Sequence, residues 1–227
     1  MATSGTFNFA PGVGECVLNA LSRIQIRGPM VKTEMLHMAT LEANLMQAEW
    51  SNRGPNLWTV DEQEVDTVAG FATYTVDPST IAVLEVTLGT GNPPNETEIL
   101  LTSISRTEYM AYPNKDLHGR PTVYWYDMLI APTITLWPVP DQVYRLHFTR
   151  YRQQQDATMR GAGNLETPYR WLDAACAGLA ARLAMHYAPA LEAQRAAQAE
   201  RAYNFAASRD KENAPLFISP MIEFYSP

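Results

Sequence analysis

The chain has 227 residues, of which 46% are hydrophobic and 18% are charged, and its formal net charge is -7. This length and composition are enough for one sizeable core or two smaller ones. The negative charge excludes a broad nucleic-acid-binding surface, because phosphate neutralisation requires a basic footprint. It is compatible with a surface past which DNA slides without sticking.

Neither the cysteines nor the hydropathy pattern indicate a secreted or membrane protein. Cys16 and Cys176 fall in apolar helical patterns, which predicts two buried free thiols rather than a disulfide framework. The first residues lack the basic and long apolar segments of a signal peptide. No window approaches the roughly 18 apolar residues of a membrane span. We therefore expect no membrane partner and synthesis in a reducing cytoplasm.

Two helices are predicted in the first part of the chain. Val17, Leu21 and Ile24 share one face of the first, which Gly28-Pro29 ends. The second covers about residues 32–51. The side of this second helix that is expected to face the core consists of Met38, Leu41, Leu45 and Ala48, flanked by Met35, Met46 and Trp50.

Strand-like runs follow in the middle of the chain. Residues 56–65 and 71–76 are predicted to form a hairpin around Ala69-Gly70. Residues 81–88 and 96–104 flank a segment rich in turn-forming residues, which predicts a second pair of neighbouring strands.

An aromatic-rich segment, residues 119–152, has the alternation of a three-stranded meander with turns at Ala131-Pro132 and at 138–141. Aromatic and β-branched residues are enriched in strands because they pack well across them, which favours a buried scaffold. The alternative is a platform for glycan or single-stranded nucleic acid, which requires aromatic rings on the outward face. Only Trp137 and one ring of the group 124–126 are expected there.

Sequence patterns also mark where later helices start and stop. Ser105 and Glu108 fit a capping box that opens a short helix. Thr167 is predicted to be the N-cap of a helix with Pro168 at its first position. Pro189 separates this helix from an alanine-rich one that runs to about residue 208. The face of the last helix that is expected to pack in the bundle or against a neighbouring subunit carries Ala196, Ala199, Tyr203 and Ala206.

No pattern in the chain predicts catalysis. The four histidines show no metal-ligand spacing, and neither cysteine belongs to a CxxC motif. Glu62, Glu64 and Asp66 alternate along one predicted strand, which is typical of a solvated face, and His147 is expected to face solvent. We therefore predict no catalytic residue, no metal site, no cofactor and no enzymatic activity.

The last fifteen residues, 213–227, combine three prolines with large apolar side chains. Prolines exclude a continuous helix, and a disordered tail is expected to be polar. An extended apolar segment requires a groove or a sheet edge, on its own subunit or on a partner. We favour the partner, and the residues expected to dock there are Leu216, Phe217, Ile218, Met221, Ile222, Phe224 and Tyr225.

Together these patterns predict an α+β fold. Residues 1–55 and 163–212 are expected to form one helical bundle from both ends of the chain, into which an antiparallel β region, 56–152, is inserted. A loop, 153–162, and the extended C-terminal tail, 213–227, complete the predicted organisation.

Three segments, in this order, resemble the head-to-tail adaptors of short-tailed phages, also called packaged-DNA stabilisation or tail accessory proteins. They are "LMQAEWSNRGPNLWTV" at 45–60, "ISRTEYMAYPNKDLHGRPTVYWYD" at 104–127 and "PTITLWPVPDQVYRLHFTRYR" at 132–152. The resemblance extends over about residues 17–207. Long-tailed phage connectors share the helical bundle, so the type of tail stays open.

The resemblance implies a structural virion protein at the head-tail junction. Such adaptors form a ring, typically twelve-fold, beneath the portal protein, close the channel on the packaged DNA and give the tail nozzle or other tail proteins a platform. Genomic DNA passes through the lumen without sequence-specific binding, and the C-terminal extension reaches the portal. The alternatives that we weigh against this are a glycan-binding module and a cell-wall hydrolase.

Overall fold

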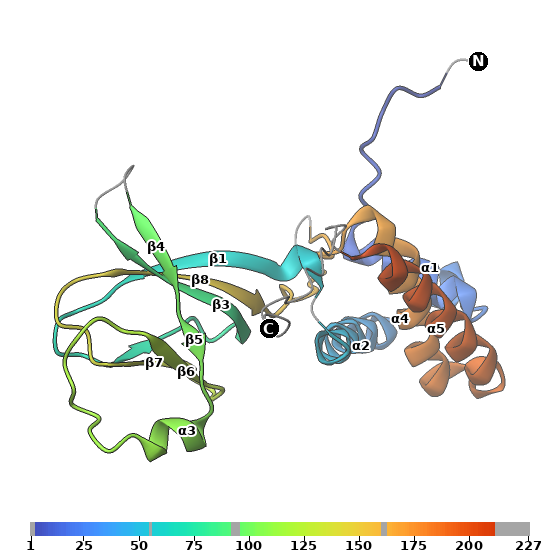
Figure 1. Cartoon of the computed structure of the whole chain (residues 1–227). Coiled ribbons are helices and arrows are strands. Elements are labelled where there is room, and N and C mark those ends of the chain that lie inside the picture. The colour runs from blue at the N-terminus through green and yellow to red at the C-terminus, as the bar shows by residue number, and fades with distance from the viewer. Residues whose placement is uncertain (1–2, 55, 92–95, 160–162, 212–227) are drawn as a thin grey trace, which may run out of the picture.

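The computed structural model describes residues 3–54, 56–91, 96–159 and 163–211, which form a helical body and a β body that adjoin each other (Figure 1). The helices are α1 (Val13–Arg23), α2 (Thr33–Asn52), α3 (Arg106–Ala111), α4 (Leu172–Tyr187) and α5 (Glu192–Arg209). The strands are β1 (Val60–Asp66), β2 (Thr73–Thr75), β3 (Thr80–Thr90), β4 (Thr97–Leu100), β5 (Thr102–Ser103), β6 (Val123–Asp127), β7 (Thr133–Trp137) and β8 (Arg145–Arg152). The predicted α+β class is confirmed.

The helical body buries one core between α1, α2, α4 and α5, which come from both ends of the chain. Small residues let the helices approach closely: Ala20, Ala180 and Ala184 are fully buried. A Cβ added to Gly178 of α4 would lie 2.6 Å from the sulfur of Met46 in α2, so only glycine fits there without movement of Met46. Cys16 and Cys176 are buried free thiols, as predicted.

Aromatic rings complete this core. The Trp171 ring centroid lies 5.3 Å from that of Trp50, 5.1 Å from that of Trp58 and 5.2 Å from that of Tyr203. These rings come from α2, α5 and the turns before β1 and α4, so a single cluster ties four separate stretches of the chain together. Aromatic contacts of this kind add to the free energy gained by burying the rings.

The buried side of α2 differs from the predicted one. Leu41 and Leu45 are 50% and 46% exposed, so they do not face the core. The residues of α2 that are buried instead are Ala39, Glu42, Ala43, Met46, Gln47 and Trp50. The prediction was wrong because Glu42 is buried by pairing with Arg182 and His186 of α4, at 3.0 Å each. Small and paired polar residues thus occupy the interface, and the leucines are left outside.

The β body consists of two four-stranded sheets packed face to face. One has the order β1-β8-β3-β4 and is antiparallel, and the other has the order β2-β7-β6-β5, in which β5 pairs with β6 in parallel. The second core lies between them. Its buried members are Val76, Val86, Leu88, Leu101, Tyr124, Ile134, Leu136, Tyr144, Leu146 and Phe148.

Two predicted strand pairings are wrong and two are confirmed. β1 pairs with β8 and β2 with β7, so no hairpin forms around Ala69-Gly70. β6 and β7 pair as expected, but β8 lies in the other sheet, so 119–152 is not a meander. The alternation of apolar and polar residues determines which face of a strand is buried, but it does not determine which other strand pairs with it. β3 and β4 form the expected antiparallel pair.

Helix starts were predicted in part. The Ser105 side chain accepts from the Glu108 N–H at 3.2 Å, and the Glu108 carboxylate accepts from the Ser105 N–H at 2.6 Å, so the capping box of α3 is confirmed. Thr167 is not an N-cap: a 3-10 turn at Tyr169–Trp171 intervenes, and α4 begins at Leu172. The break at Pro189 is confirmed. Within the described ranges, no helix has the length and apolarity needed to cross a membrane.

Candidate functional site

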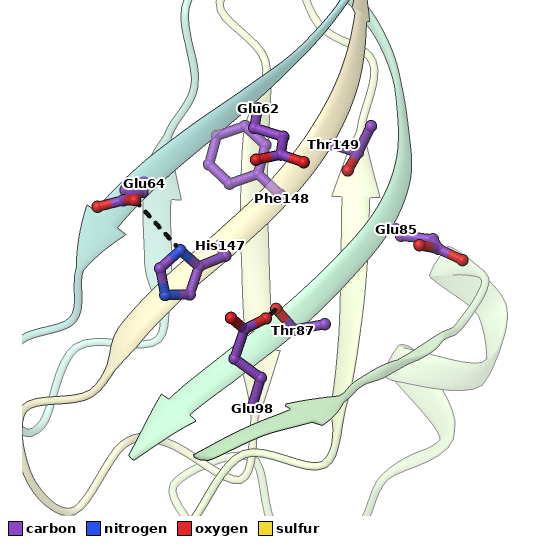
Figure 2. Close-up of a pocket in the computed structure, with 8 residues that line it drawn as sticks. All are labelled: Glu62, Glu64, Glu85, Thr87, Glu98, His147, Phe148 and Thr149. Atoms are coloured by element: carbon purple, nitrogen blue, oxygen red, sulfur yellow. Dashed lines mark hydrogen bonds and ion pairs between the residues drawn. The ribbon is translucent and has the colours of Figure 1, made fainter. Parts of the chain in front are cut away.

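An acidic face covers the outer side of the β1-β8-β3-β4 sheet. Glu62 and Glu64 project from β1, Glu85 from β3 and Glu98 from β4, around His147 of β8 (Figure 2). They border a hollow of about 430 Å³. Because strand residues alternate between faces, the carboxylates share this outward side while Leu146 and Phe148 face the core.

Only part of this acidic charge is paired within the chain. The His147 ring nitrogens lie 3.5 Å from a Glu64 oxygen and 3.4 Å from a Glu96 oxygen. Glu98 accepts a hydrogen bond from the Thr87 hydroxyl at 2.8 Å. His147 is therefore on the outward face, as predicted, but it is largely covered by its neighbours, with 22% of its side chain exposed.

The arrangement of these carboxylates favours an electrostatic role over catalysis or metal binding. The His147 ring is shared between carboxylates, and in the part of the chain that the structure describes no group of three His, Cys, Asp or Glu side chains could hold a metal ion. The carboxylates of this face give it a negative potential, which repels the phosphates of a nearby duplex.

The outward aromatic rings of the second sheet are covered. Trp137 stacks on Tyr112 with ring centroids 3.9 Å apart, and its indole N–H donates to the Asn114 carbonyl at 3.0 Å. Trp125 stacks on Tyr109 of α3 at 5.4 Å. The chain's own α3 segment thus occupies the surface that a glycan or a base would need for stacking.

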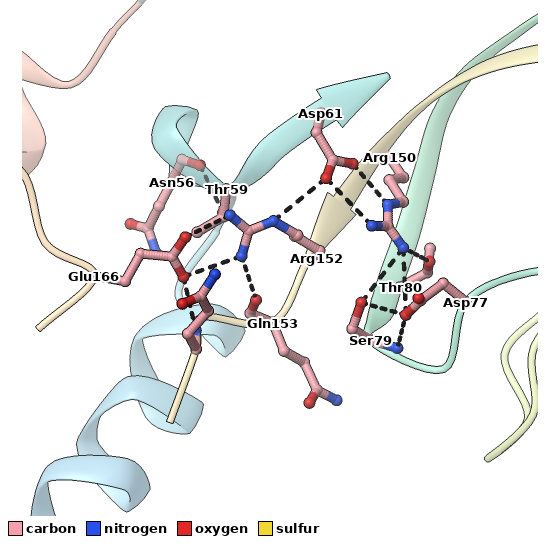
Figure 3. Close-up of polar contacts among 11 residues, drawn as sticks. Asn56, Thr59, Asp61, Asp77, Ser79, Thr80, Arg150, Arg152, Gln153 and Glu166 are labelled. Carbon is pink, nitrogen blue, oxygen red and sulfur yellow. Dashed lines mark hydrogen bonds and ion pairs between the residues drawn. The ribbon is translucent and has the colours of Figure 1, made fainter. Parts of the chain in front are cut away.

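Arg150 is the buried charge at the inner end of β8. Only 5% of the residue is exposed. Its guanidinium donates to both carboxylate oxygens of Asp61, at 2.6 and 3.2 Å, and to the Thr80 hydroxyl at 2.9 Å (Figure 3). The hydrogen bonds to Asp61 raise the pKa of Arg150 above its usual value. A buried cation satisfied in this way fixes the position of the β2–β3 loop against β1.

Arg152 joins the β body to the segment that leads into α4. It donates to the two oxygens of Glu166 at 3.0 and 2.5 Å, and its Nε lies 3.4 Å from Asp61 (Figure 3). Burial alone would raise the pKa of Glu166, but hydrogen bonds from Arg152 and from the Gln155 N–H outweigh it and lower that pKa. Trp58 adds a hydrogen bond to the Glu166 carbonyl at 3.0 Å. This polar junction therefore holds the two bodies together.

The junction was not predicted from the sequence. Acidic residues of β1 face basic residues of β8 in the pairs Asp61–Arg150, Glu64–His147 and Asp66–Arg145. This complementarity was present in the sequence as the acids Asp61, Glu64 and Asp66 and the bases Arg145, His147 and Arg150. It would have predicted the β1–β8 pairing, since opposite charges on neighbouring strands stabilise a register.

The residues predicted for partner contacts divide between described and undescribed parts of the chain. The seven apolar residues of the tail lie outside the described residues. On α5, Ala206 is buried in the helical core and Tyr203 packs against Trp50 and Trp171. Ala196 is exposed, and it borders with Ala199 a hollow between α2, α4 and α5.

Comparison with known proteins identifies the family. The model of the SU10 adaptor protein family matches residues 37–219, which is most of the chain and includes most of α2, the β body, α4 and α5. The chain belongs to the SU10 adaptor protein family. No match was found among curated proteins. Family membership makes the chain a structural adaptor protein of a phage, and the resemblance inferred from residues 45–152 is confirmed.

Proposed function

We propose that this SU10 adaptor forms a ring at the head-tail junction, beneath the portal protein, where it helps to retain packaged DNA and gives tail proteins a platform. The observation that carries the proposal is the family match over 37–219. Twelve-fold order follows from the resemblance to adaptors of short-tailed phages. The proposal makes the protein a virion component without enzymatic activity.

The exposed side of α2 supports contact between subunits. Leu41 and Leu45 lie on it one turn apart, and Ala48 follows on the same side. Apolar surface left in water by one subunit gains free energy when a second copy covers it, at about 25 cal/mol per Å². Ala196 and Ala199 of α5, next to the hollow that reaches α2, are proposed to extend this contact, whereas Tyr203 and Ala206 serve the subunit's own core.

The acidic sheet face supports a role beside passing DNA. A channel protein must not bind the phosphates that move past it, and the carboxylates around His147 repel them. We therefore place this face toward the path of the DNA in the proposed ring.

The C-terminal tail is proposed to bind the portal protein. Its large apolar residues contribute up to about 1.5–3 kcal/mol each when fully buried, while ordering the backbone costs about 1–2 kcal/mol per residue. A single tail therefore binds weakly, and simultaneous binding around a ring supplies the affinity.

Electron microscopy and co-sedimentation with purified portal rings test this function. The full chain is expected to add a ring of density to one side of the portal, and a variant that lacks 213–227 is expected to stay folded and lose binding. Leu41→Asp with Leu45→Asp is expected to block ring formation, whereas Met128→Asp, at a more exposed apolar site in the β6–β7 loop, serves as the control. Wild-type portal binding by the truncated chain would refute the role of the tail, and no binding by the full chain would refute the function.

A further inference from the structure

The two cysteines meet at one hollow between α1 and α4. Cys16 lies on α1 and Cys176 on α4, and these two helices pack directly against each other. A space of about 330 Å³ is bordered by both cysteines, with Arg23 and Asp173 at its rim and Phe9 of the N-terminal segment beside it. The only two thiols of a chain of 227 residues thus line the same hollow.

The two thiols come from helices that pack directly against each other, and both belong to the same buried core. The interaction between their side chains shifts the pKa of both thiols. Disulfide formation requires Cβ atoms about 3.5–4.5 Å apart, which two cysteines that line one hollow on directly packed helices can approach.

The surroundings make the two thiols unequal. Cys16 is 1% exposed and Cys176 is 9% exposed, so Cys176 is the more accessible. The interaction with Cys16 and the nearby Arg23 cation lower the pKa of Cys176 against the effects of burial and of Asp173. The interaction with Cys176 and burial raise the pKa of Cys16. Since the thiolate is the nucleophile, Cys176 is the residue that attacks.

We propose that Cys16 and Cys176 are an oxidisable pair that closes a disulfide between α1 and α4 when a small disulfide oxidant enters the hollow. The Cys176 thiolate attacks one sulfur of the oxidant, whose S–S bond breaks and whose first thiolate leaves and takes a proton from water. Cys16 then loses its proton and attacks the Cys176 sulfur, and the second thiol of the oxidant leaves. The protein loses two electrons and two protons, which reduce the oxidant to two thiols.

The disulfide would link α1 to α4 covalently only where the surroundings are oxidising. Reducing cytoplasm keeps thiols free, whereas disulfides persist outside cells. α1 lies before the residues that match the family, 37–219, and is held to α4 by apolar packing of Val13, Val17 and Leu21. A disulfide between positions 16 and 176 would close a long loop and restrict the unfolded chain, which stabilises the folded state.

Mass spectrometry of the full chain tests the proposal. The reduced protein is incubated with 2-hydroxyethyl disulfide, free thiols are blocked, and tryptic peptides are analysed. The peptides 1–23 and 171–182 contain the two cysteines. We expect them to be joined by a disulfide, the intact protein to lose two hydrogen atoms, and the thermal midpoint to rise by roughly 5–15 °C. Two separate mixed disulfides, or no reaction, would overturn the proposal.

Single variants test the order of the steps. Cys16→Ala is expected to stop at a stable mixed disulfide on Cys176, and Cys176→Ala is expected to give no product. Arg23→Gln is expected to slow the first step several-fold, because it removes the cation beside Cys176. If Cys16 in the Cys176→Ala variant reacted faster than Cys176 in the Cys16→Ala variant, the assigned roles would be contradicted. Should either alanine variant fail to fold, the peptide map of the unmutated chain still decides whether the disulfide forms.

Discussion

The helical body brings its backbones together through alanine and glycine, whereas the β body fills the space between its sheets with branched aliphatic and aromatic side chains. On α2 this close approach leaves Leu41 and Leu45 outside the interface, although Trp171, Leu21 and Leu183 are fully buried in the same core. The sheets enclose their large residues fully, as Leu136 and Leu146 show. The helical body therefore exposes apolar surface on α2, and the β body presents mainly charge on its antiparallel sheet.

The largest expected effect is on the aromatic cluster of the helical body. Trp171→Ala removes the ring that contacts Trp50, Trp58 and Tyr203. We expect the free energy of unfolding to fall by about 3–5 kcal/mol, measured by chemical denaturation and circular dichroism.

The same variant tests whether the helical body and the β body unfold independently. Hydrogen exchange is expected to accelerate in α4 and α5 and to change little in β7 and β8, because the two cores share no buried residue. Tyr169→Ala, at a site that is 77% exposed, is the control. Equal acceleration in both bodies would show that they unfold as one unit.

A smaller effect is expected at the junction. Arg150→Met leaves Asp61 without its main partner, and we expect a loss of about 2 kcal/mol, reduced from the value for a fully buried pair because Asp61 is 35% exposed. Urea denaturation measures the loss. Arg145→Met removes a more exposed pair of the same strands and is expected to leave the midpoint unchanged. A similar loss in both variants would contradict a special role for the buried pair.

Acid is expected to weaken the helical body through Glu42. Burial raises the pKa of this carboxyl, but hydrogen bonds from His186 and Arg182 outweigh it, so the folded-state pKa lies below the unfolded one. Its contribution to stability is therefore present above the unfolded pKa of about 4.3 and is lost as pH falls through the lower folded value. Denaturation midpoints from pH 7 to 3 measure this loss. Glu42→Gln is expected to show a shallower dependence, and an unchanged slope would contradict the assignment.

The smallest effect is expected on the acidic face. Glu62→Lys, Glu64→Lys and Glu98→Lys each raise the net charge by two, so the triple variant changes it from -7 to -1. We expect unchanged folding and weak retention on immobilised duplex DNA at low salt, lost as salt rises. The wild-type chain should not be retained. Retention of the wild type would contradict the proposed repulsion of DNA by this face.

Much of the fold could be predicted because local rules decide it. The stripe of Val17, Leu21 and Ile24, the Ser105 capping box and the break at Pro189 each depend on neighbouring residues alone. The buried side of α2 could not, because it depends on pairs between Glu42 and residues of α4 that lie about 140 positions later in the chain.

The prediction of strand pairing was partly wrong for a related reason. Alternation in β8 places Leu146 and Phe148 on the buried face, but the β7–β8 segment crosses from one sheet to the other, which no local pattern records. Of the candidate contact residues, those on α5 can be placed in the fold, while the role of the tail residues stays a prediction.

The close approach of the two chain segments at the polar junction bears on how the β body can change in evolution. The chain leaves the helical body after α2 and returns after β8, and Tyr151 donates to the Ser51 and Gly54 carbonyls at 3.3 and 3.1 Å, so the outgoing and returning segments lie side by side. An insertion whose two ends emerge together can be exchanged, lengthened or lost while the host helices keep their packing. The β body is therefore the part of this chain whose length and sequence can change with the least disturbance of the helical core.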